Sequence, residues 1–306
     1  MYSLEPELAA LRTAGGAAAA APRAPLCVAA ELRTSLYGGV ALVTAGIGLL
    51  LKKHLERIGP LTLVLLLALA AAACYLPAAR ARRAAPVRSA AADYLLLLGA
   101  LLVSADVGYA EVQFHLLGER WSLYLLLLGA WHAATAYRLH SRLVLAVALA
   151  SLAAWFGIQA GPGSVLAHAW DTPQLGARAL ACAATILGWR ALDARPSRAA
   201  FRPVFEQFAA NLAFWGALSW CLDTRLWPAG LAALLVLVAV SLRRALRARA
   251  ELFAVYAVGY GALGLIFLIA RFSGFGVLGV AQVLLVVLLA AALLRYLHAR
   301  VQDEAA

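Results

Sequence analysis

Charged residues are scarce in this sequence. Asp, Glu, Lys and Arg make up 13% of its 306 residues, whereas a typical soluble domain contains about 25%. Leu, Ala and Val take their place, in runs that are too long for the core of a globular domain. The short alternating segments of a transmembrane β-barrel are missing as well. These absences argue against a soluble domain of useful size and against a barrel, and they favour a helical membrane protein.

Motifs of catalysis and nucleotide binding are also missing. The chain contains no H-E-x-x-H, no G-x-S-x-G and no P-loop. Two G-x-G-x-x-G patterns occur at 259–264 and 274–279, but they lie in or beside apolar runs and neither follows a strand of a βαβ unit. They indicate close helix packing or a flexible joint around Arg271 instead. The four cysteines have no paired spacing, so we expect neither a disulfide framework nor a zinc site, and no cofactor.

What the sequence does contain is a repeated apolar segment of membrane-spanning length. About 20 mostly apolar residues cross a bilayer as a helix, and a helix satisfies its backbone hydrogen bonds where lipid offers no partner. We therefore predict an all-α, polytopic transmembrane helix bundle of about ten spans. The predicted spans are 34–51, 61–79, 94–112, 122–137, 143–160, 175–192, 207–222, 227–242, 251–270 and 275–297.

The basic residues are distributed unevenly between the loops that these spans define. Of the 26 Lys and Arg residues, 19 fall on the side that holds both termini and 7 fall on the other side. The positive-inside rule then predicts that both termini lie in the cytoplasm, with the chain in a bacterial inner membrane. This asymmetry and anionic lipid account for the net charge of +11. The expected partner is therefore the lipid bilayer and not nucleic acid.

The spans divide the chain into three parts. Residues 1–33 are expected to be a cytoplasmic tail with an Ala/Gly/Pro linker. Residues 34–298 form the transmembrane helical domain, and 299–306 are a short cytoplasmic C-terminal tail. A cleaved signal peptide is not expected, because the first apolar run begins late and no basic segment leads into it from the start.

An acidic residue lies deep in the third predicted span. Asp106 is about 18 Å from the beginning of that helix, just past the middle of a hydrocarbon core about 30 Å thick. A charge at this depth is costly, so it requires a buried partner, a water-filled cavity or a function. Asp106 is therefore the sharpest candidate for a binding residue, although the sequence does not name its partner.

Three polar residues follow Asp106 towards the predicted outer face. If the helix continues, Glu111, His115 and Glu119 share one face at positions i, i+4 and i+8, and Asp106 points away from that face. The three side chains would then form an outward-facing site that binds a cation or relays a proton. The alternative is that they are ordinary interfacial residues, which are inexpensive near lipid headgroups.

Other polar side chains at membrane depth are few. His132 and Thr135 lie in the fourth predicted span, Gln207 and Asn211 in the seventh, and Gln282 in the tenth. Hydrogen bonds between helices are the simplest explanation, and each contributes about 0.6–2 kcal/mol. A path for a substrate through the membrane would be expected to contain more such groups.

The first five predicted spans resemble a known family. The resemblance rests on the segments 37–46 and 53–59, on Gln113-Phe-His115-Leu-Leu-Gly118, and on Trp121 with the Leu-rich span that follows it. In these segments the chain resembles a bacterial family of predicted membrane proteins, domain of unknown function twenty-one fifty-seven, over about residues 34–157. The resemblance implies the architecture and adds Gln113 to the candidate site residues, but it implies no activity.

Three classes of function remain compatible with these observations. The first is an accessory or structural protein of the cell envelope, with another membrane protein as its partner, which fits the sparse polar interior. The second is a transporter of a small solute or ion that uses Asp106 at the midplane. The third is an outward-facing metal-dependent or acid–base enzyme that uses Glu111, His115 and Glu119.

Overall fold

The structure is a computed structural model. It describes residues 59–84, 90–120, 122–157, 172–193, 195–248, 250–273 and 277–303, together with isolated positions between 38 and 49. This part of the chain is helical and contains no strand. The predicted all-α fold class is therefore confirmed. The predicted tail 1–33 and most of the predicted first span, 34–51, lie outside the described residues.

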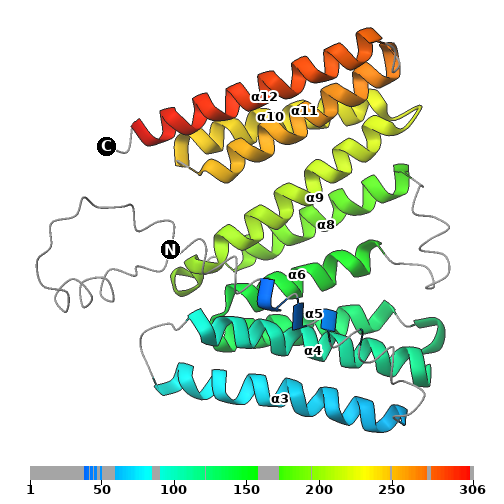
Figure 1. Ribbon diagram of the computed structural model, residues 1–306, viewed down its shortest axis with the longest axis vertical. Coiled ribbons are helices and arrows are strands. Elements are labelled where there is room, and N and C mark those ends of the chain that lie inside the picture. The colour runs from blue at the N-terminus through cyan, green and yellow to red at the C-terminus, as the bar shows by residue number, and fades with distance from the viewer. Residues whose placement is uncertain are drawn as a thin grey trace, which may run out of the picture. The chain divides into compact units, whose positions relative to one another are not determined.

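The chain divides into two compact units, and the first contains Met1–Leu116 and Ala134–Val147. Its two long helices, α3 and α4, lie side by side (Figure 1). Leu67 and Ala71 of α3 form a small buried core with Leu102 of α4. The helices of this unit are α3 (Pro60–Ala84), α4 (Ala90–Phe114), the end of α5 (Ser122–Leu139) and the beginning of α6 (Arg142–Gly157).

A small residue lets α3 and α4 approach each other closely. A Cβ atom at Gly99 of α4 would lie 3.1 Å from the ring of Tyr75 and 3.3 Å from the Cβ atom of Cys74, both on α3. Small residues at helix contacts are typical of membrane helices, because van der Waals packing has to replace the hydrophobic effect between them. The two helices thus provide apolar side chains for the contact, and Gly99 provides the space in which the Tyr75 ring packs.

The end of α4 is set by its backbone conformation. His115 has φ +49° and Gly118 has φ +54°, which are left-handed values that commonly end a helix. The His115 amide still donates to the Glu111 carbonyl at 2.8 Å, and the chain then enters the short 3-10 helix η1 (Gly118–Arg120). The helix therefore does not continue from Glu111 to Glu119.

The second unit contains Leu117–Ala133 and Ala148–Ala306. Within it, α9 contacts α8, α10 and α11, and α12 contacts α11 (Figure 1). Its helices are η1, the beginning of α5, the end of α6, α8 (Thr172–Leu192), η2 (Pro196–Phe201), α9 (Arg202–Leu222), α10 (Trp227–Ala248), α11 (Glu251–Ser273) and α12 (Val277–Asp303).

Helices α8 and α9 cross at two glycines. A Cβ atom at Gly176 would lie 2.9 Å from the carbonyl oxygen of Gly216, and a Cβ atom at Gly216 would lie 2.9 Å from the carbonyl oxygen of Gly176. The Trp220 ring covers Gly176, and its indole N–H donates to the Pro173 carbonyl oxygen at 3.0 Å. Any side chain at this crossing would push the two helix backbones apart.

Glycine also allows α10 and α11 to pack closely on their neighbours. A Cβ atom at Gly230 of α10 would lie 2.9 Å from the Ala217 carbonyl oxygen on α9, and one at Gly264 of α11 would collide with Leu234 of α10. Leu234 belongs to a core that also contains Phe214 and Leu218 of α9. Gly264 ends the first of the two G-x-G-x-x-G patterns, and of its three glycines it makes the close helix contact, whereas Gly259 has open space around it.

Six of the described helices are long and apolar enough to cross a membrane. They lie at the predicted second, third, sixth, eighth, ninth and tenth spans. Helix α6 is apolar but shorter, while α5 and α9 carry polar residues such as His132 and Glu206. Each of the nine predicted spans from 61–79 onward nevertheless overlaps an α-helix of the described residues. The total of ten spans and the cytoplasmic position of the termini stay predictions.

Candidate functional site

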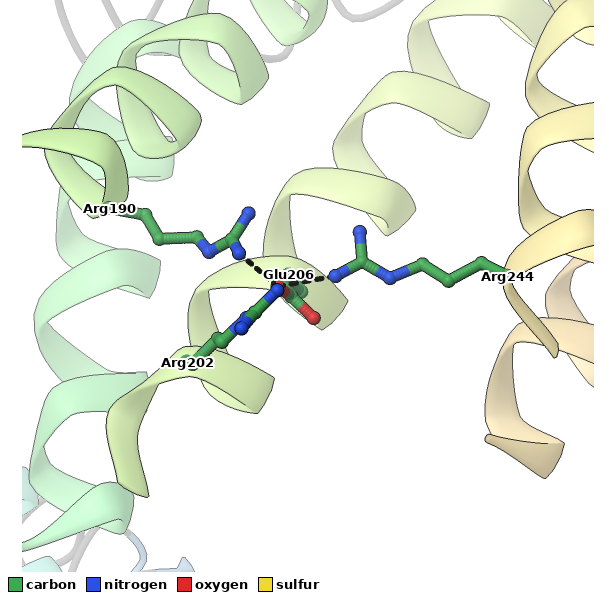
Figure 2. A network of polar contacts seen from close by, with 4 residues as sticks. All are labelled: Arg190, Arg202, Glu206 and Arg244. Carbon is green, nitrogen blue, oxygen red and sulfur yellow. Dashed lines mark hydrogen bonds and ion pairs between the residues drawn. The ribbon is translucent and has the colours of Figure 1, made fainter. Parts of the chain in front are cut away.

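A buried carboxylate near the beginning of α9 forms the densest charged cluster in the described residues. Glu206 is 8% exposed, and three guanidinium groups converge on it (Figure 2). Its Oε1 atom lies 2.7 Å from Arg190 of α8, 2.9 Å from Arg202 of α9 and 2.5 Å from Arg244 of α10. We call these four residues the Glu206 cluster. It joins the ends of three helices at one atom.

The charges of the Glu206 cluster do not balance. A buried carboxylate without partners would cost several kcal/mol, and charge-assisted hydrogen bonds are the strong kind that offsets this cost. Three guanidinium groups share one carboxylate, however, so the formal charges of the cluster sum to +2. All three arginines belong to the same side of the membrane in the predicted topology, and the structure does bring them together. The cluster is therefore an electropositive centre as well as a structural contact.

A cavity of about 360 Å³ opens beside this cluster. We call it the arginine pocket. Arg198 on its wall contacts the carboxylate of Asp193 at 2.5 Å, and the Trp189 ring packs edge-on against Phe205 with 5.4 Å between ring centroids. The pocket is lined by Arg190, Ala191, Asp193, Arg195, Arg198, Ala199, Phe201, Arg202 and Phe205. Its lining therefore contains basic side chains together with two aromatic side chains, Phe201 and Phe205, which are buried.

A second buried polar contact lies in the first unit. The hydroxyl of Ser141 donates to Oδ1 of Asp93 at 3.1 Å, and the Ser141 oxygen is 3.5 Å from the amide of Val144. Ser141 directly precedes α6, so its side chain is placed as an N-cap. Both residues are buried. The hydrogen bond connects the beginning of α4 to the beginning of α6, which indicates a structural role.

Asp106 lies within α4, and its predicted depth in the membrane stays a prediction. Its Oδ1 atom is inaccessible to solvent and has no hydrogen-bond partner within the described residues. Ser104, two residues earlier, donates to the Ala100 carbonyl oxygen of its own helix. Asp106 therefore remains the polar group of α4 that most needs an explanation, and whether it binds anything is a prediction.

The other candidate residues lie at the end of α4 and beyond it. Glu111 and Gln113 are in the last turn, His115 is exposed in the left-handed turn, and Glu119 is in η1. The side chain of Glu119 is outside the described part of the chain. Because α4 ends at Phe114, the shared helical face that required a continuing helix does not form. Among the described residues, no group of three or more His, Cys, Asp and Glu side chains is placed to hold a metal ion.

The polar residues expected at membrane depth have several different environments. The hydroxyl of Tyr260 on α11 donates to the side-chain oxygen of Asn211 at 2.7 Å. The side-chain amide of Asn211 donates to the backbone carbonyl oxygen of Gln207 at 3.2 Å. The contact with Tyr260 is the interhelical hydrogen bond that the sequence predicted for Asn211. His132 of α5 is completely buried, while Gln282 of α12 is exposed.

These observations define an α-helical membrane protein with several candidate spans. Residues 8–145 match the model of a family described as Predicted membrane protein (DUF2157), which confirms the family resemblance. The matched segment contains α3, α4 and the five candidate residues between Asp106 and Glu119. The Glu206 cluster and the arginine pocket lie beyond it. No curated protein and no solved structure matches the chain.

Proposed function

We propose that this protein is an accessory or structural component of a bacterial inner membrane, with both termini in the cytoplasm. The observation that carries the proposal is the use of polar side chains in α9. Glu206 is held by Arg190, Arg202 and Arg244, and Asn211 is held by Tyr260. Polar groups that could have lined a path for a solute instead connect α9 to α8, α10 and α11.

The surface of the last helix supports the same proposal. Only 11% of the residues between Gly279 and Tyr296 are buried, against 28% of an 18-residue window within Glu251–Phe272 of α11. Large apolar side chains project outward along α12, including Leu284, Leu285 and Leu288. A helix of this kind offers a continuous apolar face to lipid or to the helix of another membrane protein.

A transporter is the second candidate, and one observation favours it. Asp106 has a buried oxygen without a hydrogen-bond partner in the described residues, and ionisable residues inside membrane helices often mark the paths of ions or protons. The two proposals differ in whether activity depends on the ionisable group at this position.

Complementation of a deletion strain separates the two candidates. Loss of an accessory protein should increase the sensitivity of the cell envelope to detergent, and both the wild type and Asp106→Asn should restore resistance at equal membrane levels. Asn has nearly the same shape as Asp but cannot ionise. If Asp106→Asn fails to restore resistance while it accumulates normally, the accessory proposal is wrong and the transporter is favoured.

Proteoliposomes give an independent measurement. Purified wild-type protein and Asp106→Asn are reconstituted with a pH-sensitive dye inside the vesicles, and an ion gradient is applied. The accessory proposal predicts the same dye response for both proteins and for empty vesicles. A flux that the wild type supports and Asp106→Asn loses would contradict it.

A further inference from the structure

The arginine pocket has a charge that its own residues do not neutralise. Four arginines line it, namely Arg190, Arg195, Arg198 and Arg202, and Arg244 joins them through Glu206. Within the described part of the chain, Asp193 and Glu206 form ion pairs with this set. Five positive charges and two negative charges leave a net charge of +3 on one small region. Even with these ion pairs formed, the region attracts anions.

The positive-inside rule alone does not produce this arrangement. That rule requires basic residues somewhere in a cytoplasmic loop, and exposed chains directed into solvent would satisfy it. Here the end of α8, the segment before η2 and the beginning of α9 each place at least one arginine on the wall of the same cavity. The positive end of the α9 dipole lies at the same place, since Phe201 and Arg202 also line the cavity.

The walls of the pocket suit a phosphate group. A guanidinium group forms paired, parallel hydrogen bonds to phosphate oxygens, and it is the side chain most suited to that geometry. Phe201 and Phe205 are 3% and 1% exposed, so one side of the cavity is apolar, which strengthens electrostatic attraction within it. A volume of about 360 Å³ is within the range of small-ligand sites, about 300–1,000 Å³.

We propose that the arginine pocket binds a phosphate-bearing anion at the predicted cytoplasmic surface of the membrane. The candidate span of α8 ends at Leu192, directly beside the residues that line the cavity. Lipid phosphates lie at that level, and basic pockets between membrane helices on this side bind anionic headgroups. A soluble phosphorylated compound carries the same group, so the experiment has to separate these two sources.

The experiment uses the full chain in nanodiscs. Thermal unfolding is measured in phosphatidylcholine discs, in discs that also contain phosphatidylglycerol, and in phosphatidylcholine discs with added inorganic phosphate or pyrophosphate. A lipid headgroup site predicts stabilisation by phosphatidylglycerol, with little response to the free anions. A site for a soluble phosphate compound predicts the opposite pattern. Either pattern supports a phosphate site, whereas no stabilisation by any of these anions would overturn it.

Substitutions in the pocket test whether the response arises there. Arg195→Gln removes an exposed charge from the lining of the pocket, and we expect apparent affinity for the stabilising anion to fall about tenfold. Arg178→Gln is the matched control, because Arg178 lies in the first half of α8, away from the pocket, and donates a hydrogen bond to the Gln174 side chain. An equal loss in both variants would show nonspecific surface attraction and overturn the proposal.

A third variant keeps the proposal testable if Arg195→Gln does not fold. Ala199 lines the cavity and is exposed, so Ala199→Glu places a carboxylate in the pocket without burying a new side chain. It should abolish the anion response while unfolding in phosphatidylcholine alone stays close to that of the wild type. If Ala199→Glu responds to anions as the wild type does, the proposal is wrong even where Arg195→Gln cannot be purified.

Discussion

The hydroxyl group of Tyr260 on α11 donates a hydrogen bond to the side-chain oxygen of Asn211 on α9, at 2.7 Å. The Tyr260 ring also stacks on Phe214 of α9, with 4.7 Å between the ring centroids. One residue thus gives the α9–α11 contact both its polar and its aromatic component.

Removing the hydroxyl should weaken this contact without removing the stacked ring. Tyr260→Phe is expected to destabilise the protein by about 0.6–2 kcal/mol, the range for hydrogen bonds between membrane helices. Unfolding in detergent measures the change, and a double-mutant cycle with Asn211→Ala isolates the pair. Additive effects of the two substitutions would show that the hydrogen bond contributes nothing.

Neutralising Glu206 should have a larger effect. Glu206→Gln leaves Arg190, Arg202 and Arg244 facing one another without their shared carboxylate, so we expect a loss of about 3 kcal/mol of unfolding free energy. Glu251→Gln is the control, because Glu251 is exposed in the first turn of α11 and its loss should cost less than about 1 kcal/mol. Chemical denaturation in mild detergent compares the two variants. Equal losses would contradict a structural role for the cluster.

Substitution at the α8–α9 crossing should act through the backbone. Gly216→Ala places a Cβ atom 2.9 Å from the Gly176 carbonyl oxygen and 2.8 Å from Leu180, so we expect a loss of about 1–3 kcal/mol, as for an overpacked core. Gly188 of α8 has open space around it. Gly188→Ala should be neutral or stabilising by about 0.5–1 kcal/mol, because Ala is the better helix former. Thermal unfolding of both variants checks this difference in sign.

Acid should weaken the turn between α9 and α10. The backbone amides of Leu226 and Arg225 donate to Oδ1 of Asp223, each at 2.7 Å, and they lower the pKa of that carboxyl below its ordinary value. A lowered folded-state pKa means that the stabilisation is fully present above the unfolded pKa, about 3.9, and is lost as pH falls through the folded value. Asp223→Asn should therefore unfold at a lower temperature than the wild type at neutral pH. The two melting curves should converge below about pH 4, and a constant difference would contradict this.

The predicted orientation can be tested by labelling. In a background without other cysteines, Arg195→Cys should be protected from a membrane-impermeant maleimide in intact spheroplasts and become reactive after lysis. Arg225→Cys, in the turn between α9 and α10, should react without lysis. Both positions are exposed, so burial does not account for protection. Protection of Arg225→Cys and labelling of Arg195→Cys would reverse the topology that the positive-inside rule predicts.

The helices could be predicted from the sequence because apolar length and backbone hydrogen bonding decide them within lipid. The end of α4 could not, since it depends on His115 adopting a left-handed conformation that non-glycine residues rarely adopt. A shared helical face from Glu111 to Glu119 required α4 to continue, and α4 ends at Phe114.

Only part of the Glu206 cluster could be predicted from the sequence. Arg202 and Glu206 have the i, i+4 spacing of a helical ion pair, which a reading of the sequence could have identified. The positions of Arg190 and Arg244 in the cluster depend on how α8 and α10 pack on α9, and a single sequence does not contain that information. The same holds for Asp93, whose partner Ser141 is 48 residues away.

The composition of α9 has a consequence for how this protein enters the membrane during synthesis. Helix α9 is not among the helices that are apolar enough to cross the bilayer by themselves, because it carries Arg202, Glu206 and Asn211. Glu206 pairs with Arg190, which is translated before α9, and with Arg244, which is translated after it. Asn211 accepts a hydrogen bond from Tyr260, which also follows α9 in the chain. We expect the translocon to retain α9 until α10 and α11 emerge, so that these helices partition into lipid as a group.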